Sequence, residues 1–311
     1  MWGSMSSQPP KHHPNAQKIA IIAAEIGWGS GFAAAERGPE LLLGAGLADR
    51  LDATVTRIAS VPSMAEGELA TSEIEKVIMK HTLRISDAVL GAVQNGMFPV
   101  VIGGDHTSAL GFHTGLARAY GETGIVWVDT HPDLNTPETS PSGNIHGMVL
   151  AGLLGRGSEL MLATTAACQT QQEHVAMVGV REIDSGEQNW LNEGKINCMK
   201  MDEVRERGLA TCMRAAVDTA NQGEAGFGLT IDIDVIDPSE APFVATPVNG
   251  GLSVEECAKA LSDLPHKDRL LGMEVVEFTP RDSEPNDVQN ACELIVSFVS
   301  AVTGVAVKPT I

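Results

Sequence analysis

The sequence predicts an α/β fold in which a mainly parallel sheet is covered by helices. Short apolar runs alternate along the chain with longer segments of helical periodicity. Polar and charged residues repeatedly follow the apolar runs directly, as expected where ligands bind outside the carboxyl ends of parallel strands. With 311 residues, of which 43% are hydrophobic, the chain can bury a large core. We therefore expect the functional residues to gather at one edge of the sheet.

The predicted strands are apolar runs in which β-branched residues are frequent. They lie at Lys18–Ala24, Ala53–Ile58, Phe98–Ile102, Gly124–Val128, Val175–Val180, Gly226–Ile231 and Leu270–Val276. Gly103 and Gly104 follow the third of these runs and allow a tight turn at the end of the strand. His106 should therefore leave the sheet at the same edge as Asp129.

The predicted helices carry apolar residues at helical spacing and lie between the strands. They cover about Pro39–Leu51, Glu66–Asn95, Ser108–Tyr120, a segment that reaches Leu154, Val254–Leu261 and Asp287–Val302. Pro39 favours the first turn of its helix, where its missing N–H is not needed. For the glycine-rich segment Gly27–Gly31 the sequence predicts no more than a flexible turn near the mouth of the site.

Residues 1–17 are polar and include three prolines, so we expect a disordered extension. Its Gly3-Ser4-Met5 stretch is typical of a cloning junction, which indicates that part of the extension is an expression tag. Residues 18–311 show no internal repeat and no linker, and they are predicted to form a single domain.

Composition limits the classes of partner. A net charge of −19 makes nucleic acid an unfavourable partner, because phosphate binding needs basic patches. No apolar run approaches the about 18 residues of a membrane span, and no signal-peptide pattern is present. The five cysteines form no Cys-x-x-Cys motif and predict reduced thiols.

We expect a cytoplasmic protein with neither a membrane nor a nucleic acid as partner. The acidic charge would steer cationic ligands, although it also serves solubility.

The densest set of candidate functional residues lies between Trp127 and Met148. Asp129, His131 and Asp133 follow a predicted strand at alternate positions, where an extended segment points them to one side. Carboxylates and imidazole that converge in this way are costly to bury unless a cation holds them. The ligand types suit manganese, zinc, nickel or iron, and the absence of cysteine argues against a thiolate zinc site.

Three strand ends together supply the candidate metal ligands, which are His106, Asp129, His131, Asp133, Asp232 and Asp234. Four carboxylates and two histidines are too many for one ordinary ion. They suit a pair of ions about 3.5–4 Å apart, with a bridging water as nucleophile. Each group alone has another explanation, since a histidine after glycines can cap a helix and aspartates before Pro238 can form a turn. Together they predict metal-assisted hydrolysis of a carbon or phosphorus centre.

Four motifs closely resemble the ureohydrolase, or arginase–agmatinase, family. They are Gly-Gly-Asp-His at 103–106, Asp-Thr-His-Pro-Asp at 129–133, Ser-Gly-Asn-Ile-His-Gly at 142–147 and Asp-Ile-Asp-Val-Ile-Asp-Pro at 232–238. The resemblance extends over about 18–304. It implies a three-layer α/β/α sandwich around a mainly parallel sheet of about eight strands. It also implies two Mn²⁺ ions, which Ni²⁺ or Co²⁺ could replace, and hydrolysis of a guanidinium to urea by a hydroxide bridging the metals.

The same resemblance assigns the ligands to two metals. One metal would take His106, Asp129, Asp133 and Asp232, and the other would take Asp129, His131, Asp232 and Asp234. The usual Asp-Ala-His is Asp-Thr-His here, which keeps the ligands and adds a hydroxyl from Thr130, with a minor expected effect. The predicted catalytic set consists of His146, Glu277 and Asp133. His146 would shuttle a proton to the leaving amine, and Glu277 would pair with the substrate guanidinium.

Residues outside the metals decide the substrate. The resemblance to arginases includes Asn135, Ser142 and Asn144 on the long loop, and Asp184 and Glu187 on the next. It implies that Asn135 and Ser142, with Ser140 as a possible helper, bind an α-carboxylate. Asp184 would take the α-ammonium with support from Glu187, and Thr246 resembles a family threonine just behind the guanidinium site. Such donors and acids fit an amino acid, whereas a decarboxylated amine would leave the donors unpaired.

The alternatives remain open at this point. Asn135 and Ser142 could simply form turns in a proline-rich loop, and Asp184 could cap a helix that begins at Ser185. The function favoured is hydrolysis of L-arginine to L-ornithine and urea. A sister enzyme acting on agmatine, guanidinobutyrate or another guanidine is the first alternative, and a metal-poor binding or regulatory subunit is the second. A formimino-compound hydrolase is more distant. The resemblance implies a homotrimer or a homohexamer, between which the sequence does not choose.

Overall fold

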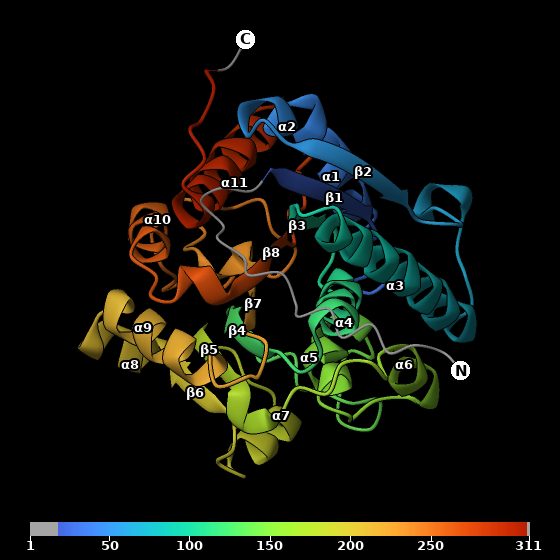
Figure 1. Cartoon of the computed structure of the whole chain (residues 1–311). Coiled ribbons are helices and arrows are strands. Elements are labelled where there is room, and N and C mark those ends of the chain that lie inside the picture. Colours follow the sequence, from blue (N-terminus) through green and yellow to red (C-terminus); the bar gives the residue numbers. More distant parts are fainter. Residues whose placement is uncertain (1–17, 310–311) are drawn as a thin grey trace, which may run out of the picture.

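Eight parallel strands form one sheet at the centre of the fold (Figure 1), in a computed structural model that describes residues 18–309. Their order across the sheet is β2-β1-β3-β8-β7-β4-β5-β6. The strands are β1 Ile19–Glu25, β2 Thr54–Ala59, β3 Phe98–Gly103, β4 Gly124–Val128, β5 Val175–Val180, β6 Asn197–Lys200, β7 Phe227–Asp232 and β8 Leu270–Val276. The predicted parallel sheet is confirmed. The extension predicted over residues 1–17 lies outside the described residues.

Helices cover both faces of the sheet, which confirms the predicted three-layer sandwich (Figure 1). The longer helices are α1 Ala33–Gly44, α3 Thr71–Gln94, α4 Ser108–Tyr120, α9 Leu209–Ala220, α10 Val254–Ser262 and α11 Asp287–Thr303. The shorter ones are α2 Leu47–Arg50, α5 Val149–Leu153, α6 Glu159–Thr164, α7 Ser185–Leu191 and α8 Met201–Arg207. Single 3₁₀ turns are η2 Met64–Glu66, η3 Ile145–Met148, η4 Gln172–His174, η5 Ile233–Val235 and η6 Lys267–Arg269.

The hydrophobic core lies in the two layers between sheet and helices. On one face, Leu42 of α1, Met213 of α9 and Phe298 of α11 pack against the sheet. On the other face, Ile85 of α3 and Phe112 of α4 do the same. The central strands β3, β8, β7 and β4 are buried along their whole length, which explains why they are near-continuous apolar runs rather than alternating ones. Their carboxyl ends therefore form a rigid edge for a site.

Pro39 lies in the interior of α1, so the prediction that it opens this helix is wrong. The helix begins at Ala33, because three consecutive alanines are strong helix formers and extend it toward the N-terminus. The neighbouring Gly38 has a positional reason, since a Cβ there would lie 2.6 Å from the carbonyl oxygen of Phe278. The helix thus packs closely against the chain just after Glu277. Within residues 18–309, no helix has the length and apolarity required to cross a membrane.

Candidate active site

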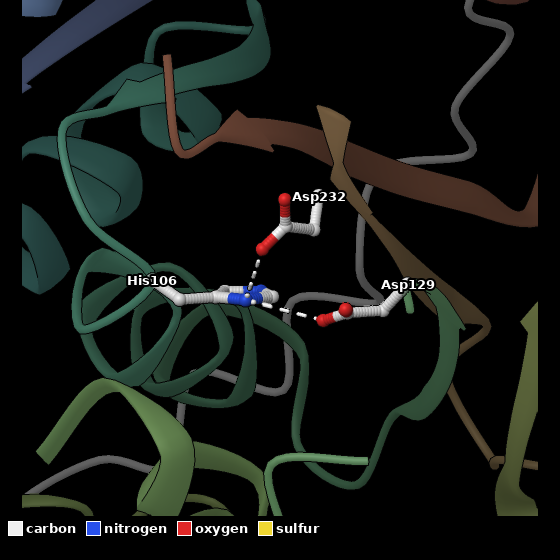
Figure 2. Close-up of side chains that lie close together, drawn as sticks. All are labelled: His106, Asp129 and Asp232. Carbon is white, nitrogen blue, oxygen red and sulfur yellow. Dashed lines mark ion pairs between the residues drawn. The ribbon is translucent and has the colours of Figure 1, made fainter. Parts of the chain in front are cut away.

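A buried histidine and three carboxylates converge at the carboxyl edge of the sheet. The Nδ1 atom of His106 lies 3.3 Å from Oδ2 of Asp129, 3.0 Å from Oδ2 of Asp133 and 3.1 Å from Oδ2 of Asp232. Figure 2 shows His106, Asp129 and Asp232 pointing toward one another from three different segments. His106 and Asp129 follow β3 and β4, and Asp232 is the last residue of β7, which explains why residues far apart in the sequence meet here.

A second group lies beside the first and shares Asp129 with it. The Nδ1 atom of His131 is 3.0 Å from Oδ2 of Asp234 and 3.7 Å from Oδ1 of Asp129. Asp129 thus presents one oxygen to each group. Asp232 belongs to the first group alone, and its Oδ1 accepts the backbone N–H of Asp234 at 2.8 Å. The assignment of Asp232 to both metals stays a prediction.

The two groups have the chemistry of divalent-metal sites. His106, Asp129 and Asp232 could hold one ion, and Asp129, His131 and Asp234 could hold another. Burial and the charges of Asp133 and Asp234 raise the pKa of Asp129 to about 7, and burial and Asp234 raise that of Asp232 well above its ordinary value. Asp133 Oδ2 is buried without a hydrogen bond although it faces His106. Several carboxylate oxygens that converge on one imidazole nitrogen in a buried site fit a shared cation.

The segment after β4 turns instead of continuing as a strand. We expected Asp129, His131 and Asp133 to point to one side of an extended segment, but the strand ends at Val128 and Asp133 has a φ of +53°. Aspartate tolerates this left-handed conformation better than most residues. The turn brings Asp129 and Asp133 to His106 and leaves His131 facing the second group.

Two neighbours of the ligands make contacts with them that the sequence analysis did not predict. The ring of Trp127 stacks on that of His106 with 4.4 Å between centroids, and its Nε1 donates to Asp129 Oδ2 at 3.0 Å. A tryptophan in a buried strand needs a partner for its N–H, and this was the available signal. The hydroxyl of Thr130 donates to the backbone carbonyl of Asp234 at 2.8 Å. It therefore fixes the backbone position of a candidate metal ligand.

A loop between η5 and α10 is tied to the second group by two side chains. Thr246 Oγ1 donates to Asp234 Oδ2 at 3.0 Å. Arg181, which follows β5 directly, donates from Nη2 to the carbonyl oxygens of Asp234 at 2.9 Å and Val248 at 2.7 Å. Arg181 was not predicted, although its position just after a strand was a signal. Thr246 was predicted near the guanidinium site, and it contacts a carboxylate of the metal groups.

His146, which is half-buried at the cleft, pairs with the buried Glu277. Glu277 Oε1 lies 3.0 Å from Nδ1 of His146 and accepts the backbone N–H of His106 at 2.8 Å. Its Oε2 is buried and has no partner. Burial lowers the pKa of His146, but the Glu277 carboxylate outweighs it and raises the pKa to about 9. Glu277 also has a φ of +70°, a strained conformation typical of functional positions.

A cleft of about 270 Å³ opens above the two groups. Its wall includes the predicted residues Asn135, Ser142, Asn144, His146, Asp184, Glu187 and Thr246. It also includes Ser140 and Glu182, the second of which was not predicted. The metal-group residues His106, His131, Asp133 and Asp232 lie at the cleft as well. Asp129, Asp234 and Glu277 are buried around it.

The two loops on the cleft wall are joined by hydrogen bonds. Asn135 Nδ2 donates to Asp184 Oδ2 at 2.8 Å, and Glu187 accepts the backbone N–H groups of Asp184 at 2.9 Å and Leu134 at 3.1 Å. Burial raises the pKa of Glu187 to about 7. Asp184 is also the N-terminal cap of α7. The residue therefore caps the helix and lines the cleft at the same time. On the other loop, Ser142 Oγ accepts the backbone N–H of Asn144 at 3.2 Å.

Comparison with known proteins agrees with the fold. The arginase family model matches residues 17–300. Arginase of Bacillus caldovelox is 35% identical over 86% of this chain and 93% of its own, and arginase of Bacillus subtilis is 32% identical over 90% and 97%. The structure of Entamoeba histolytica arginase in complex with L-ornithine superposes with a TM-score of 0.81 at 27% identity, covering 91% of this chain and 98% of that one.

The chain belongs to the arginase family. The predicted family, the predicted fold and the prediction that the chain is an enzyme of this family are thereby confirmed.

Proposed function

We propose that the protein hydrolyses the guanidinium group of L-arginine to L-ornithine and urea. The observation that carries the proposal is the position of Asp129, which offers one carboxylate oxygen to each of two metal groups at the floor of a cleft. The wall of the same cleft presents neutral donors and acids. This combination suits a substrate with a cationic reacting end and a zwitterionic far end.

We propose two Mn²⁺ ions as the cofactor, with Ni²⁺ or Co²⁺ as possible substitutes. Carboxylate oxygens with imidazole suit these ions. When bound, the metal pair would stabilise negative charge and lower the pKa of the attacking water. His106, Asp129, Asp133 and Asp232 would hold the first ion, and Asp129, His131, Asp232 and Asp234 the second. Trp127 and Thr246 support this proposal because they fix the orientation of Asp129 and Asp234.

The pair of His146 and Glu277 has two proposed tasks. The unpaired Oε2 of Glu277 would accept hydrogen bonds from the guanidinium, whose planar N–H fork matches a carboxylate. His146 would hold a proton and give it to the leaving amine, since its raised pKa keeps the ring protonated at neutral pH. The leaving group is then a neutral amine rather than an amide anion.

The far end of the cleft would recognise an α-amino acid. Asn135 has two amide hydrogens and spends one on Asp184, which leaves the other for a carboxylate. The hydroxyl of Ser142 accepts a backbone N–H and still has its own hydrogen to donate, with Ser140 and Asn144 beside it. Asp184 would bind the α-ammonium, and Glu187 would keep Asp184 in place.

Replacing Ser142 by Ala tests this recognition. We expect KM for L-arginine to rise about tenfold or more with kcat little changed, since a hydrogen bond to a charged group is worth about 1.5–3 kcal/mol. Agmatine lacks the α-carboxylate, so its kinetics should not change. Asp184→Asn keeps a side-chain acceptor for the helix cap but removes the charge, and it should raise KM for both compounds. Unaltered L-arginine kinetics in both variants would argue against the assignment.

The alternatives predict different behaviour. An enzyme for agmatine or guanidinobutyrate would keep the metal groups but would not need both halves of this recognition site. A binding or regulatory subunit would not need the metal groups, and the closeness of the six candidate ligands to one another supports the enzyme instead. Metal analysis of the purified protein, together with urea release, separates these possibilities from the proposal.

Three further properties are proposals of the same kind. Residues 18–311 are proposed to act as one catalytic domain, assembled as a homotrimer or homohexamer. The proposed compartment is the cytoplasm, which the five free cysteines support.

A further inference from the structure

The glycine-rich turn after β1 is held by a buried carboxylate that the mechanism above does not use. Asp105 is fully buried, and its Oδ2 accepts the backbone N–H groups of Gly29 at 2.6 Å and Ser30 at 3.0 Å. Its Oδ1 accepts the backbone N–H of Thr107 at 3.0 Å and also the Thr107 hydroxyl. One carboxylate therefore joins the turn after β1 to the turn after β3, which carries His106.

Close packing at Gly29 makes this junction tight. A Cβ on Gly29 would collide with the Cγ2 methyl of Thr107 and would lie 3.0 Å from Oδ2 of Asp105. Gly29 is absent from the residues with a positive φ, so backbone conformation does not require glycine there. The absence of a side chain is instead what lets the Gly29 backbone reach Asp105.

The outer side of the same turn contacts the loop of the cleft. The Gly29 carbonyl oxygen accepts the backbone N–H of His146 at 3.3 Å. The Ser30 carbonyl oxygen accepts Nδ2 of Asn144, also at 3.3 Å. The N–H groups of this dipeptide are thus bound to Asp105, while its carbonyl groups face the proposed proton shuttle and a residue of the cleft wall.

We propose that Asp105 is a positioning residue, which acts through the Gly29–Ser30 backbone to hold His146 and Asn144 at the cleft. The proposal rests on the function proposed above. It gives the segment Gly27–Gly31 a role, which is to position the cleft loop that carries Asn144 and His146. Asp105 itself does not touch the substrate.

Asp105→Asn is the first test. In either orientation, the NH₂ group of the new amide faces backbone N–H donors, with which it cannot form hydrogen bonds. The hydrogen bonds to Gly29 and Ser30, or the one to Thr107, are therefore lost. We expect kcat/KM for L-arginine to fall about 10- to 100-fold, the size of effect that follows a displacement of about 1 Å. The manganese content of the variant should match that of the wild type. Asp87→Asn makes the same chemical change at an exposed ion pair with Arg118 and should leave all values unchanged.

Gly29→Ala tests the turn from its other side. The variant should show a similar loss, with both kcat and KM affected because His146 and Asn144 move together. Adding Thr107→Ser removes the colliding methyl and keeps the hydroxyl, so the double variant should recover about tenfold of the loss. A purely structural weakening would lower the unfolding temperature without this recovery.

Hydrogen–deuterium exchange provides a measurement that does not depend on turnover. The amide of His146 should exchange faster in Asp105→Asn and Gly29→Ala than in Asp87→Asn, because its acceptor is Gly29. Unchanged exchange and unchanged kinetics would overturn the proposal. A fall in kcat/KM that is fully explained by a lower manganese content would also overturn it. If the wild type prefers another guanidine, the proposed substrate is wrong, and the same comparison with that guanidine and the exchange data decide the role of Asp105.

Discussion

Asp129→Asn is expected to remove both metals and reduce urea release at least about a thousandfold, which corresponds to about 4 kcal/mol of lost transition-state stabilisation. Asp129 is the residue that the two metal groups share, so its loss weakens both at once. An amide is neutral and offers a single oxygen, whereas the carboxylate offers Oδ2 to one group and Oδ1 to the other.

A thermal measurement distinguishes this effect from misfolding. Burial raises the pKa of Asp129, so its charge is costly without metal, and the metal-free variant should unfold at the same temperature as the metal-free wild type or at a higher one. Added Mn²⁺ should raise the unfolding temperature of the wild type but not of the variant. Asp87→Asn, at the protein surface, should respond to Mn²⁺ like the wild type. Normal metal content and turnover in Asp129→Asn would contradict the shared site.

Glu277→Gln is expected to lower kcat/KM about 10²- to 10³-fold with the metals retained, by analogy with the loss of one well-placed charged partner of a reacting group. The Oε2 atom of Glu277 is buried and unpaired, so it is available to the guanidinium. The substitution leaves an amide that can still accept from the backbone N–H of His106.

The same variant should shift the pH profile. Glu277 raises the pKa of His146, and without that carboxylate the imidazolium loses its proton at a lower pH. Because the role proposed for His146 requires a protonated ring, the alkaline decline of kcat should move to lower pH. Glu274→Gln is the matched control, since Glu274 is a buried carboxyl on β8, the strand that Glu277 directly follows, and its partners are Ser108 and Thr230. An equal loss in both variants would remove the specific role of Glu277.

The sheet and most of the site were predictable because the signals are local. Each central strand is an apolar run, and the residue types that suit a metal follow it within a few positions. The carboxyl ends of parallel strands meet at one edge, so the sequence alone predicts that His106, Asp129 and Asp232 lie close together. The motifs thus predicted which residues could be metal ligands, but not how their side chains are oriented.

The remaining features depend on contacts that no local pattern contains. The start of α1 was misplaced because Pro39 is tolerated inside a helix that three alanines begin. The left-handed turn at Asp133 decides which carboxylate faces which histidine, and alternate spacing predicted an extended chain instead. The hydrogen bond between the Gly29 N–H and Asp105 joins residues 76 positions apart in the sequence. The sequence therefore predicted a turn at Gly29 but not the contact that requires glycine there.

Urea release by the manganese-loaded protein, with L-arginine, agmatine, guanidinobutyrate and guanidine measured in parallel, tests the central claim most directly. The account predicts a strong preference for L-arginine in kcat/KM, because the α-carboxylate and the α-ammonium are each bound by the cleft wall. Equal or better turnover of agmatine or guanidinobutyrate would contradict the proposed recognition by Asn135, Ser142 and Asp184. No urea from any of the four, with two metals bound per chain, would contradict the proposed reaction itself.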